Sequence, residues 1–223
     1  MDQVREKPWL AHYDPGVPPE IQVPDIPLWR FLEESARRFP QNVALEFLGK
    51  TLSYQELWGL ARRFAQGLKD LGVRPGDRVA IMLPNSPQFV IAFYGTLLAG
   101  GVGVNVNPLY TPRELRHQLA DAGAETLVIL DHLLPRYLEV EKEVPVKRVV
   151  VTGIKDFLPF PKNLLYPLKA KRDGLPLGFP KREGFHAFAE LLKRPPAEPH
   201  VPDPEDLALL QYTGGTTGLS KGA

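Results

Sequence analysis

The sequence predicts an α/β protein in which a mostly parallel sheet is covered by helices on both faces. Short apolar segments typical of strands alternate along the chain with amphipathic segments typical of helices. Several of the strand segments are apolar on both faces, as in sheets that are buried on both sides. Right-handed crossover helices between parallel strands cover both faces of such a sheet.

The composition excludes several classes of protein. The 223 residues are enough for a large core in one domain or slightly more. The 27 basic and 26 acidic residues nearly cancel, which gives no electrostatic case for a nucleic-acid partner. Because the chain has no cysteine, disulfides, thiolate catalysis and cysteine zinc sites are excluded. The five histidines are scattered without the spacing of metal ligands.

Nothing in the sequence indicates export or a membrane span. The first residues lack the apolar segment of a signal peptide. No apolar run reaches the roughly 18 residues that a spanning helix needs. We therefore expect a cytoplasmic protein.

The N-terminal part is expected to hold an irregular arm, a helix and a hairpin. Prolines interrupt the arm at residues 1–24, and a helix is expected at 28–39. Alternating apolar residues at 43–47, a turn at Gly49 and a return at 51–53 predict a short hairpin. The apolar residues at helical spacing in the first helix are Leu28, Phe31, Leu32, Ala36 and Phe39.

Two helix starts carry a capping box, in which two side chains satisfy free backbone N–H groups. Ser53 and Glu56 begin an amphipathic helix, and Thr111 and Glu114 begin another that ends at Gly123. The apolar stripe of the first of these helices is Leu57, Leu60, Ala61, Phe64, Ala65 and Leu68.

A third helix and several buried strands complete the α/β pattern. Ser86 followed by a proline predicts the start of a buried helix at 88–99, which two glycines end. Strands are expected at 78–83, 102–106, 126–130 and 147–152.

Residues 153–184 form a proline-rich insertion that is both basic and apolar. Its segment 157–172 is too short and too interrupted to span a bilayer. One interpretation is a surface excursion whose apolar residues pack on the parent domain. The alternative is contact with a membrane interface, where aromatic and leucine side chains beside lysines suit anionic lipid, or contact with a second copy in a homodimer.

The last twelve residues carry the strongest functional signal. After an apolar strand at 207–212, glycines allow the backbone to turn sharply and to present its N–H groups to an anion. Threonine hydroxyls add donors or metal ligands, and a lysine adds a mobile positive charge. This combination suits the phosphates of a nucleotide. The candidate binding residues are Tyr212, Thr213, Gly214, Gly215, Thr216, Thr217, Gly218, Leu219, Ser220, Lys221, Gly222 and Ala223.

The spacing excludes two common nucleotide motifs. A Walker A loop requires Gly-Lys-[Ser/Thr], whereas Ser220 precedes Lys221 and Gly222 follows it. The dinucleotide pattern Gly-x-Gly-x-x-Gly is also absent from the loop. The remaining alternative to a phosphate site is a surface turn rich in glycine and threonine.

The segment resembles the ATP-binding signature of adenylate-forming enzymes, usually Tyr-Thr-Ser-Gly-Thr-Thr-Gly-x-Pro-Lys-Gly. Gly214 replaces the usual serine and Ser220 the usual proline, which is similar to the bacterial long-chain fatty acid CoA ligases of this family. Segments 52–57, 72–79 and 98–115 follow the family's order and spacing. The resemblance covers most of residues 28–223.

The resemblance implies a division of the chain. The family has two stacked α/β sheets, a small barrel and a smaller C-terminal domain. Residues 25–194 would then be the first sheet subdomain, with 195–204 as its exit linker. Residues 205–223 would begin a truncated second subdomain with its first strand and the ATP loop.

The resemblance also implies a two-step ligase. A fatty acid carboxylate attacks the α-phosphate of Mg-ATP to give an acyl-adenylate and diphosphate, and the CoA thiolate then displaces AMP. Residues 213–218 would cradle the phosphates, Lys221 would neutralise the departing diphosphate, and Thr213 would contact Mg²⁺. The expected partners are therefore fatty acid, ATP and CoA.

Several family motifs have no counterpart in this sequence. They are the adenine- and ribose-binding motifs, the acidic Mg²⁺ ligand, the fatty-acid tunnel and the lysine of the small domain. We therefore expect the N-terminal part of a longer enzyme, inactive on its own. Two alternatives stay open: a ligase of the same family for another carboxylic acid, and a non-enzymatic half-protein that binds lipid or a partner.

Overall fold

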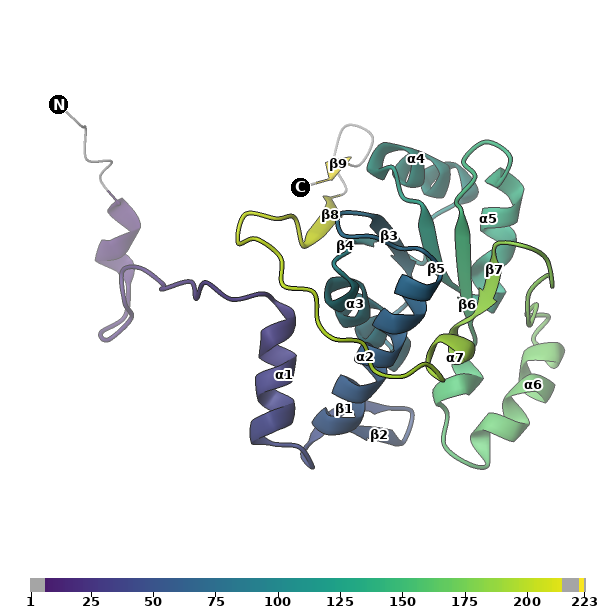
Figure 1. Cartoon of the computed structure of the whole chain (residues 1–223), viewed down its shortest axis with the longest axis horizontal. Helices are drawn as coiled ribbons and strands as arrows, with labels where there is room; N and C mark the ends of the chain where they lie inside the picture. Colours follow the sequence, from purple (N-terminus) through teal and green to yellow (C-terminus); the bar gives the residue numbers. More distant parts are fainter. Residues whose placement is uncertain (1–6, 214–220, 223) are drawn as a thin grey trace.

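A seven-stranded sheet forms the centre of the protein in the computed structural model, which describes residues 7–213 and 221–222 (Figure 1). The strand order is β7-β6-β5-β3-β4-β8-β9. All neighbouring strands are parallel except β8 and β9. The strands are β3 (Arg78–Met82), β4 (Val102–Asn105), β5 (Thr126–Leu130), β6 (Arg148–Thr152), β7 (Phe185–Ala187), β8 (Leu209–Thr213) and β9 (Lys221–Gly222).

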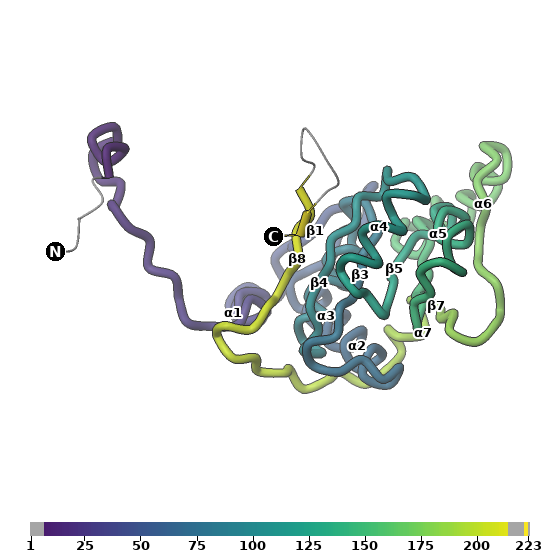
Figure 2. The backbone as a smooth tube through the Cα atoms, turned by 90° about the horizontal axis from the view of Figure 1, so that it is seen from above, coloured from purple at the N-terminus to yellow at the C-terminus, as the bar shows by residue number. Residues whose placement is uncertain are grey.

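Helices lie on both faces of this sheet, as the sequence predicts. Figure 2 shows α2 and α3 on one side of the central strands and α4 and α5 on the other. The helices are α1 (Trp29–Arg38), α2 (Tyr54–Asp70), α3 (Pro87–Ala99), α4 (Pro112–Ala122), α5 (Leu134–Val140), α6 (Lys162–Arg172) and α7 (Phe188–Leu191). Short 3-10 turns are η1 (Pro8–His12), η2 (Asp131–Leu133) and η3 (Ile154–Phe157).

The core lies between the sheet and these helices. Every residue of β5 is buried, and so are four of the five residues of β3, because both strands are covered on both faces. Val79 of β3 pairs with Gly103 of β4 and Thr126 of β5, which fixes the register at the centre of the sheet. The central strands are therefore the rigid part on which the edge residues are placed.

The helix starts confirm the capping predictions. The hydroxyl of Ser53 accepts a hydrogen bond from the N–H of Glu56, whose carboxylate accepts one from the N–H of Ser53. Thr111 and Glu114 make the same exchange at α4. Ser86 caps α3 through the N–H of Phe89.

Helix α1 forms where expected, but only two of its five expected apolar residues are buried. Trp29 is buried, stacks on Trp58 at 6.3 Å between ring centroids, and donates its indole N–H to the carbonyl of His200. The burial of Trp29 with Leu32 and Ala36 directs the opposite side of the helix to solvent. Leu28, Phe31 and Phe39 are therefore exposed, although they share the helical spacing.

Residues before α1 form an arm with η1 and little other regular structure. Figures 1 and 2 both show the described part of this arm extending from the body of the protein. The hairpin of β1 (Val43–Phe47) and β2 (Lys50–Ser53) follows α1, as predicted. Leu48, in the turn between the two strands, has a positive φ of 53°.

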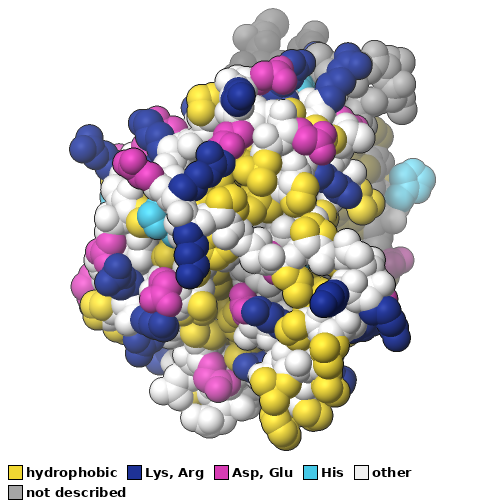
Figure 3. Space-filling view, turned by 90° about the vertical axis from the view of Figure 1, so that its right-hand side faces the viewer, with side chains coloured by type: hydrophobic (Ala, Val, Ile, Leu, Met, Phe, Trp, Pro, Cys, Tyr) yellow, Lys and Arg dark blue, Asp and Glu magenta, His cyan; other side chains and the backbone are white. Residues whose placement is uncertain are grey.

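The insertion contains a helix that the sequence analysis did not predict, because prolines interrupt the segment. Helix α6 includes Pro167 and lies against η3 at the lower right of Figure 1. Figure 3 faces this side of the molecule, and apolar side chains gather at its lower edge beside basic ones. Within the described residues, no helix is long and apolar enough to cross a membrane.

The proline-rich segment 195–204 crosses the helical layer and is tied to it. Arg62 of α2 donates to the carbonyl of Ala197 at 2.8 Å, and Lys69 donates to that of Glu198 at 2.8 Å. The chain then enters β8, which pairs with β4 of the same seven-stranded sheet. The division into a subdomain at 25–194, a linker at 195–204 and a second subdomain from 205 stays a prediction.

Candidate functional site

The strand order creates a crossing point at the centre of the sheet. From β3 the chain passes to its neighbour β4, and then returns across β3 to β5 on the other side. In open parallel sheets, ligands bind outside the carboxyl ends of the strands near such a point. Strand β8, beside β4, ends at Thr213 on this edge. The candidate loop therefore begins at the edge where a ligand site is expected.

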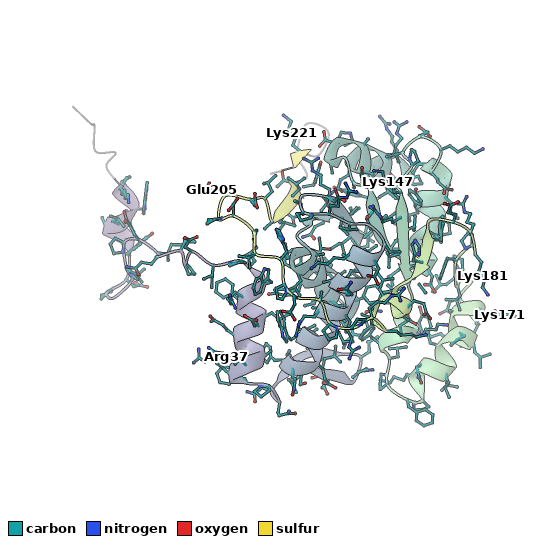
Figure 4. All side chains as sticks on the ribbon, in the orientation of Figure 1. Arg37, Lys147, Lys171, Lys181, Glu205 and Lys221 are labelled. Atoms are coloured by element: carbon teal, nitrogen blue, oxygen red, sulfur yellow. The ribbon has the colours of Figure 1, made fainter. Side chains whose placement is uncertain are left out.

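The two sides of the candidate loop are paired with each other. Strand β9 is antiparallel to β8, with Gly222 opposite Tyr212 and Lys221 opposite Thr213. Figure 4 labels Lys221 on β9, beyond the ends of the central strands. The structure thus brings together Thr213 and Lys221, the predicted metal contact and the predicted phosphate-binding lysine. The other candidates, namely Gly214, Gly215, Thr216, Thr217, Gly218, Leu219, Ser220 and Ala223, lie outside the described residues.

Tyr212 anchors this strand pair to helix α4. Its side chain is buried, and its hydroxyl donates to Asp121 Oδ2 at 2.6 Å. Burial raises the pKa of Tyr212 well above its usual range, and the hydrogen bond to the Asp121 carboxylate raises it further. The phenol is therefore protonated at neutral pH and remains a donor to Asp121.

Gly222 packs directly on this tyrosine. A Cβ at Gly222 would lie 3.0 Å from Cε2 of the Tyr212 ring, closer than ordinary contact. Because Asp121 holds the hydroxyl, the ring has little freedom to move aside. Because residue 222 is a glycine, β9 can pack directly against the Tyr212 ring. The strands on both sides of the candidate loop therefore contact the same fixed side chain.

Side-chain amides reinforce the pairing of β8 with β4. Asn105 Nδ2 donates to Gln211 Oε1 at 2.9 Å, and Gln118 Nε2 donates to the carbonyl of Asn105 at 2.7 Å. Asn105 Oδ1 and Gln118 Oε1 are buried and have no hydrogen-bond partner among the described residues. Buried acceptors normally find a donor. Two buried acceptors below the candidate loop are therefore left without a donor among the described residues.

The neighbouring loop after β4 is also fixed in place. Arg136 of α5 donates to the carbonyls of Pro108 at 2.6 Å and Tyr110 at 3.0 Å. Asn107 Oδ1 accepts from the N–H of Leu109 at 2.9 Å. Both loops at the carboxyl edge next to β8 thus have defined anchors.

Sequence reasoning missed the residues that support the site. Asp121, Asn105 and Gln118 lie on elements that the sequence predicts, but their partners are far along the chain: Asp121 and Tyr212 are 91 residues apart. No local pattern links two residues at that distance. The only indication of such a contact in the sequence was Tyr212, because a buried tyrosine ring needs a hydrogen-bond partner for its hydroxyl.

A cavity of about 500 Å³ lies at the amino ends of the parallel strands. It is lined by residues before β3, β4 and β8, including Gly101 and Ala208, and by His200 of the proline-rich segment. It therefore opens at the amino ends of the strands, away from Thr213. The candidate phosphate site is distinct from this cavity.

A family model described as AMP-binding enzyme matches residues 32–223. This span includes the sheet, the anchoring residues and the candidate loop. The chain belongs to the AMP-binding enzyme family.

Within this family, the chain is similar to bacterial long-chain-fatty-acid–CoA ligases. The chain is 43% identical over 221 residues to the long-chain-fatty-acid–CoA ligase of Bacillus subtilis (strain 168), covering 97% of this chain and 39% of that protein. It is 39% identical over 228 residues to the long-chain-fatty-acid–CoA ligase of Escherichia coli O157:H7, covering 98% and 40%. The chain therefore spans about two fifths of the length of these relatives.

Solved structures show the same fold. A long-chain-fatty-acid-CoA ligase from Archaeoglobus fulgidus is 26% identical, with a TM-score of 0.72, over 92% of this chain and 37% of that one. The anthranilate CoA ligase AuaEII, solved with anthranoyl-AMP, has a TM-score of 0.73 at 24% identity over 90% and 35%. The predicted α/β fold of adenylate-forming enzymes is confirmed.

Proposed function

We propose that this chain is the N-terminal α/β part of an ATP-dependent long-chain fatty acid CoA ligase. The observation that carries the proposal is the β8–β9 pair. These two strands flank a Gly/Thr-rich loop at the carboxyl ends of the parallel strands. The similarity to the Bacillus subtilis ligase supports the substrate class. The reaction would join fatty acid, ATP and CoA into acyl-CoA, AMP and diphosphate through an acyl-adenylate.

The residues of this chain would act by position and charge. Residues 213–218 would offer backbone N–H and hydroxyl groups to the phosphates of ATP, and the Lys221 ammonium would neutralise the diphosphate as it leaves. In many enzymes, groups already in place to stabilise developing charge contribute most of the rate enhancement. Tyr212 and Asp121 would hold both sides of the loop in that arrangement.

Magnesium fits this site as an ion carried by ATP. Thr213 is exposed at the end of β8 and offers a hydroxyl oxygen, a suitable ligand for a hard cation. Among residues 7–213 and 221–222, no group of three or more His, Asp or Glu side chains could hold a metal. In this proposal Thr213 would contribute one oxygen ligand, and the bound ion would offset phosphate charge.

The proposed setting is the cytoplasm, with peripheral contact to a membrane. Long-chain fatty acids partition into bilayers, and segment 157–172 would provide the contact through which the enzyme meets them. A homodimer formed through the same segment is the alternative.

The proposal can be tested by fusing the chain to the remaining part of a related ligase. We would fuse the chain to the part of the Bacillus subtilis ligase that follows its matching segment. The fusion is expected to release AMP in a fatty-acid- and CoA-dependent reaction, and the 223-residue chain alone to release none. Circular dichroism would confirm that both proteins fold. AMP release by the chain alone, or a folded fusion without activity, would contradict the proposal.

A variant of the fusion tests the role of Lys221. Lys221→Ala is expected to lower kcat/KM about 100-fold, because one charge-stabilising contact to the phosphates is lost. Lys181→Ala is the matched control, since Lys181 is exposed and lies near α6 on the opposite side of the molecule (Figure 4). Equal rates in the two variants would remove Lys221 from the phosphate site.

A second candidate function is ligation of another carboxylic acid by the same chemistry. The chain is 33% identical over 209 residues to 4-coumarate-CoA ligase 1 of Narcissus pseudonarcissus. Either relative can supply the part of the enzyme that follows its matching segment. Fusions to each of the two relatives, each assayed with a long-chain acid and an aryl acid, would separate the two functions: a higher kcat/KM in the fusion to the Bacillus subtilis ligase favours the fatty acid, and a higher value in the other fusion favours the aryl acid.

A further inference from the structure

Helix α6 turns one face to the protein and leaves the other exposed. Ala170 is 1% exposed and faces inward. Burial raises the pKa of Tyr166 on the same face, and the carboxylates of Asp131 and Asp173 raise it further. This inward face packs on the body of the protein, so the orientation of the helix is fixed.

The outward face of α6 is strongly apolar. Phe160 is 78% exposed, Leu164 65%, Leu165 57% and Leu168 69%. Leu164 and Leu168 are four residues apart and therefore lie on one side of the helix, and Phe160 precedes its first turn. We call these four residues the α6 patch. The interpretation in which the apolar residues of the insertion pack on the parent domain therefore holds for Phe157 and Leu158, which are buried, but not for the α6 patch.

The tip of the β1–β2 hairpin extends this patch. Lys162 Nζ donates to the carbonyl of Leu48 at 2.8 Å, and a Cβ at Gly49 would lie 3.5 Å from the same nitrogen. Leu48 is 55% exposed. Two segments that are far apart in the sequence thus lie side by side and both present exposed leucine side chains.

Basic residues accompany the apolar face. Helix α6 contains four basic residues and no acidic one. Arg172 pairs with Asp173 at 3.3 Å, whereas Lys169 and Lys171 have no ion-pair partner within the described part of the chain. Figure 4 shows Lys171 at the outer edge of the molecule, with Lys181 nearby. The α6 patch is therefore flanked by ammonium groups that are free to bind an anion.

We propose that the α6 patch and Leu48 dock on a bilayer that contains anionic phospholipid. The leucines and Phe160 would enter the boundary between headgroups and acyl chains, while Lys169 and Lys171 would bind lipid phosphates. A second copy of this chain is a poorer occupant, because it would bring the same basic residues together. The inference rests on the membrane contact in the proposed function and names the residues and the lipid that make it.

A label on the patch provides the first test. The chain has no cysteine, so Leu168→Cys gives a single site for an environment-sensitive fluorophore. Vesicles of phosphatidylcholine with phosphatidylglycerol are expected to shift its emission to the blue and to brighten it. Leu109→Cys is the matched control, because Leu109 is 80% exposed in the loop after β4, away from α6. An equal response at both positions, or none at Leu168, would overturn the proposal.

Vesicle sedimentation tests the apolar and basic parts separately. The double variants Leu164→Ser with Leu168→Ser, and Lys169→Glu with Lys171→Glu, are each expected to weaken binding about tenfold or more. Leu109→Ser and Arg37→Glu, which change exposed residues elsewhere, are expected to bind like the unchanged chain. Added salt should reduce binding of the unchanged chain.

Other outcomes would overturn the membrane contact. They are the absence of vesicle binding by the unchanged chain, or concentration-dependent dimers that the Leu164→Ser and Leu168→Ser changes dissolve while vesicle binding persists. Neither experiment involves ATP, so loss of the membrane contact would leave the ligase proposal standing. Failure of the ligase assay would equally leave the vesicle result intact.

Discussion

At the scale of single residues, Tyr212 links the candidate phosphate loop to the rest of the fold. Its ring lies under Gly222 of β9, its backbone belongs to β8, and its hydroxyl is held by Asp121 of α4. The two strands on either side of the loop and a helix on one face of the sheet therefore meet at one side chain. The two ends of the loop are thus positioned by packing and hydrogen bonding within the protein itself.

Replacement of the hydroxyl should cost measurable stability. Tyr212→Phe is expected to lower the free energy of unfolding by about 1 to 2 kcal/mol, because a hydrogen bond to a charged acceptor is lost. Asp121 is exposed, so water can take the place of the phenol and keep the cost near the lower value. Urea unfolding measures it. Tyr13→Phe, in the arm, is the control and should change nothing.

The same residue predicts a dependence on alkaline pH. The folded state holds the Tyr212 proton more tightly than the unfolded state, because burial and the Asp121 hydrogen bond raise its pKa. Its contribution is complete below about pH 10, the ordinary tyrosine pKa, and is lost as the pH rises above that value. From about pH 9 to pH 11, the unchanged chain should lose stability more steeply than Tyr212→Phe. Tyr94, Tyr137 and Tyr166 are common to both proteins, so parallel curves would contradict the assignment.

At the scale of elements, α2 organises one face of the sheet. Phe64 packs on Phe188 of α7 at 4.6 Å between ring centroids, and one turn further on Gly67 meets Leu191 of the same short helix. A Cβ at Gly67 would lie 2.5 Å from the Cβ of Leu191. The absence of a side chain at Gly67 therefore sets how closely α7 approaches.

Two glycines of α2 should respond in opposite directions. Gly67→Ala is expected to destabilise the protein by about 1 to 3 kcal/mol, because α7 has to move. Gly59→Ala is expected to stabilise it by up to about 1 kcal/mol, because no atom lies within 4 Å of the added methyl and alanine favours the helix. Thermal or urea unfolding of the two variants provides the comparison. A similar change in both would show that helix propensity, and not the contact with Leu191, controls the result.

The elements differ in how far the sequence predicts them. The helices after Ser53, Ser86 and Thr111 can be predicted from local signals. A capping residue, apolar residues at helical spacing and a glycine after the last turn all lie within a few turns of one another. Helix α6 was hidden, since Pro167 argues against a helix unless the surroundings support it. The apolar spacing of α1 identifies Leu32 and Ala36, which are buried, but it misses Trp29, because the partner of Trp29 lies on another helix.

At the scale of the whole molecule, the segment 195–204 joins the two ends of the sheet. It follows α7 near the edge strand β7, crosses the layer of α2 and α3, and leads to β8 near the other side of the sheet. Arg62 and Lys69 hold it to α2, and the N–H of His200 donates to the carbonyl of Leu98 in α3. The position of the candidate loop therefore depends on contacts on the far side of the helical layer.

Loss of one tie should loosen this connection. Arg62→Ala is expected to lower the free energy of unfolding by about 1 to 3 kcal/mol, because its guanidinium bonds to Ala197 and Glu198 are lost. Amide exchange in 195–204 should also become faster. Arg37→Ala, at an exposed position on α1, is the control and should stay within about 0.5 kcal/mol. Unchanged exchange in the Arg62 variant would show that the segment is held by its other contacts alone.

The pairing of β8 with β4 has a consequence for the order of folding. Gly103 and Leu209 are partners across the sheet, with nearly half the chain between them, whereas β3 and β4 are joined by a single helix. Pairings of large sequence separation close slowly, because the entropy of a long loop is lost before the contact forms. During synthesis, β3 to β6 emerge and can assemble while β8 is still on the ribosome. We therefore expect the strand pair that flanks the candidate loop to be the last part of the sheet to mature, so that a nucleotide bound there, as proposed, would meet only chains whose core is already built.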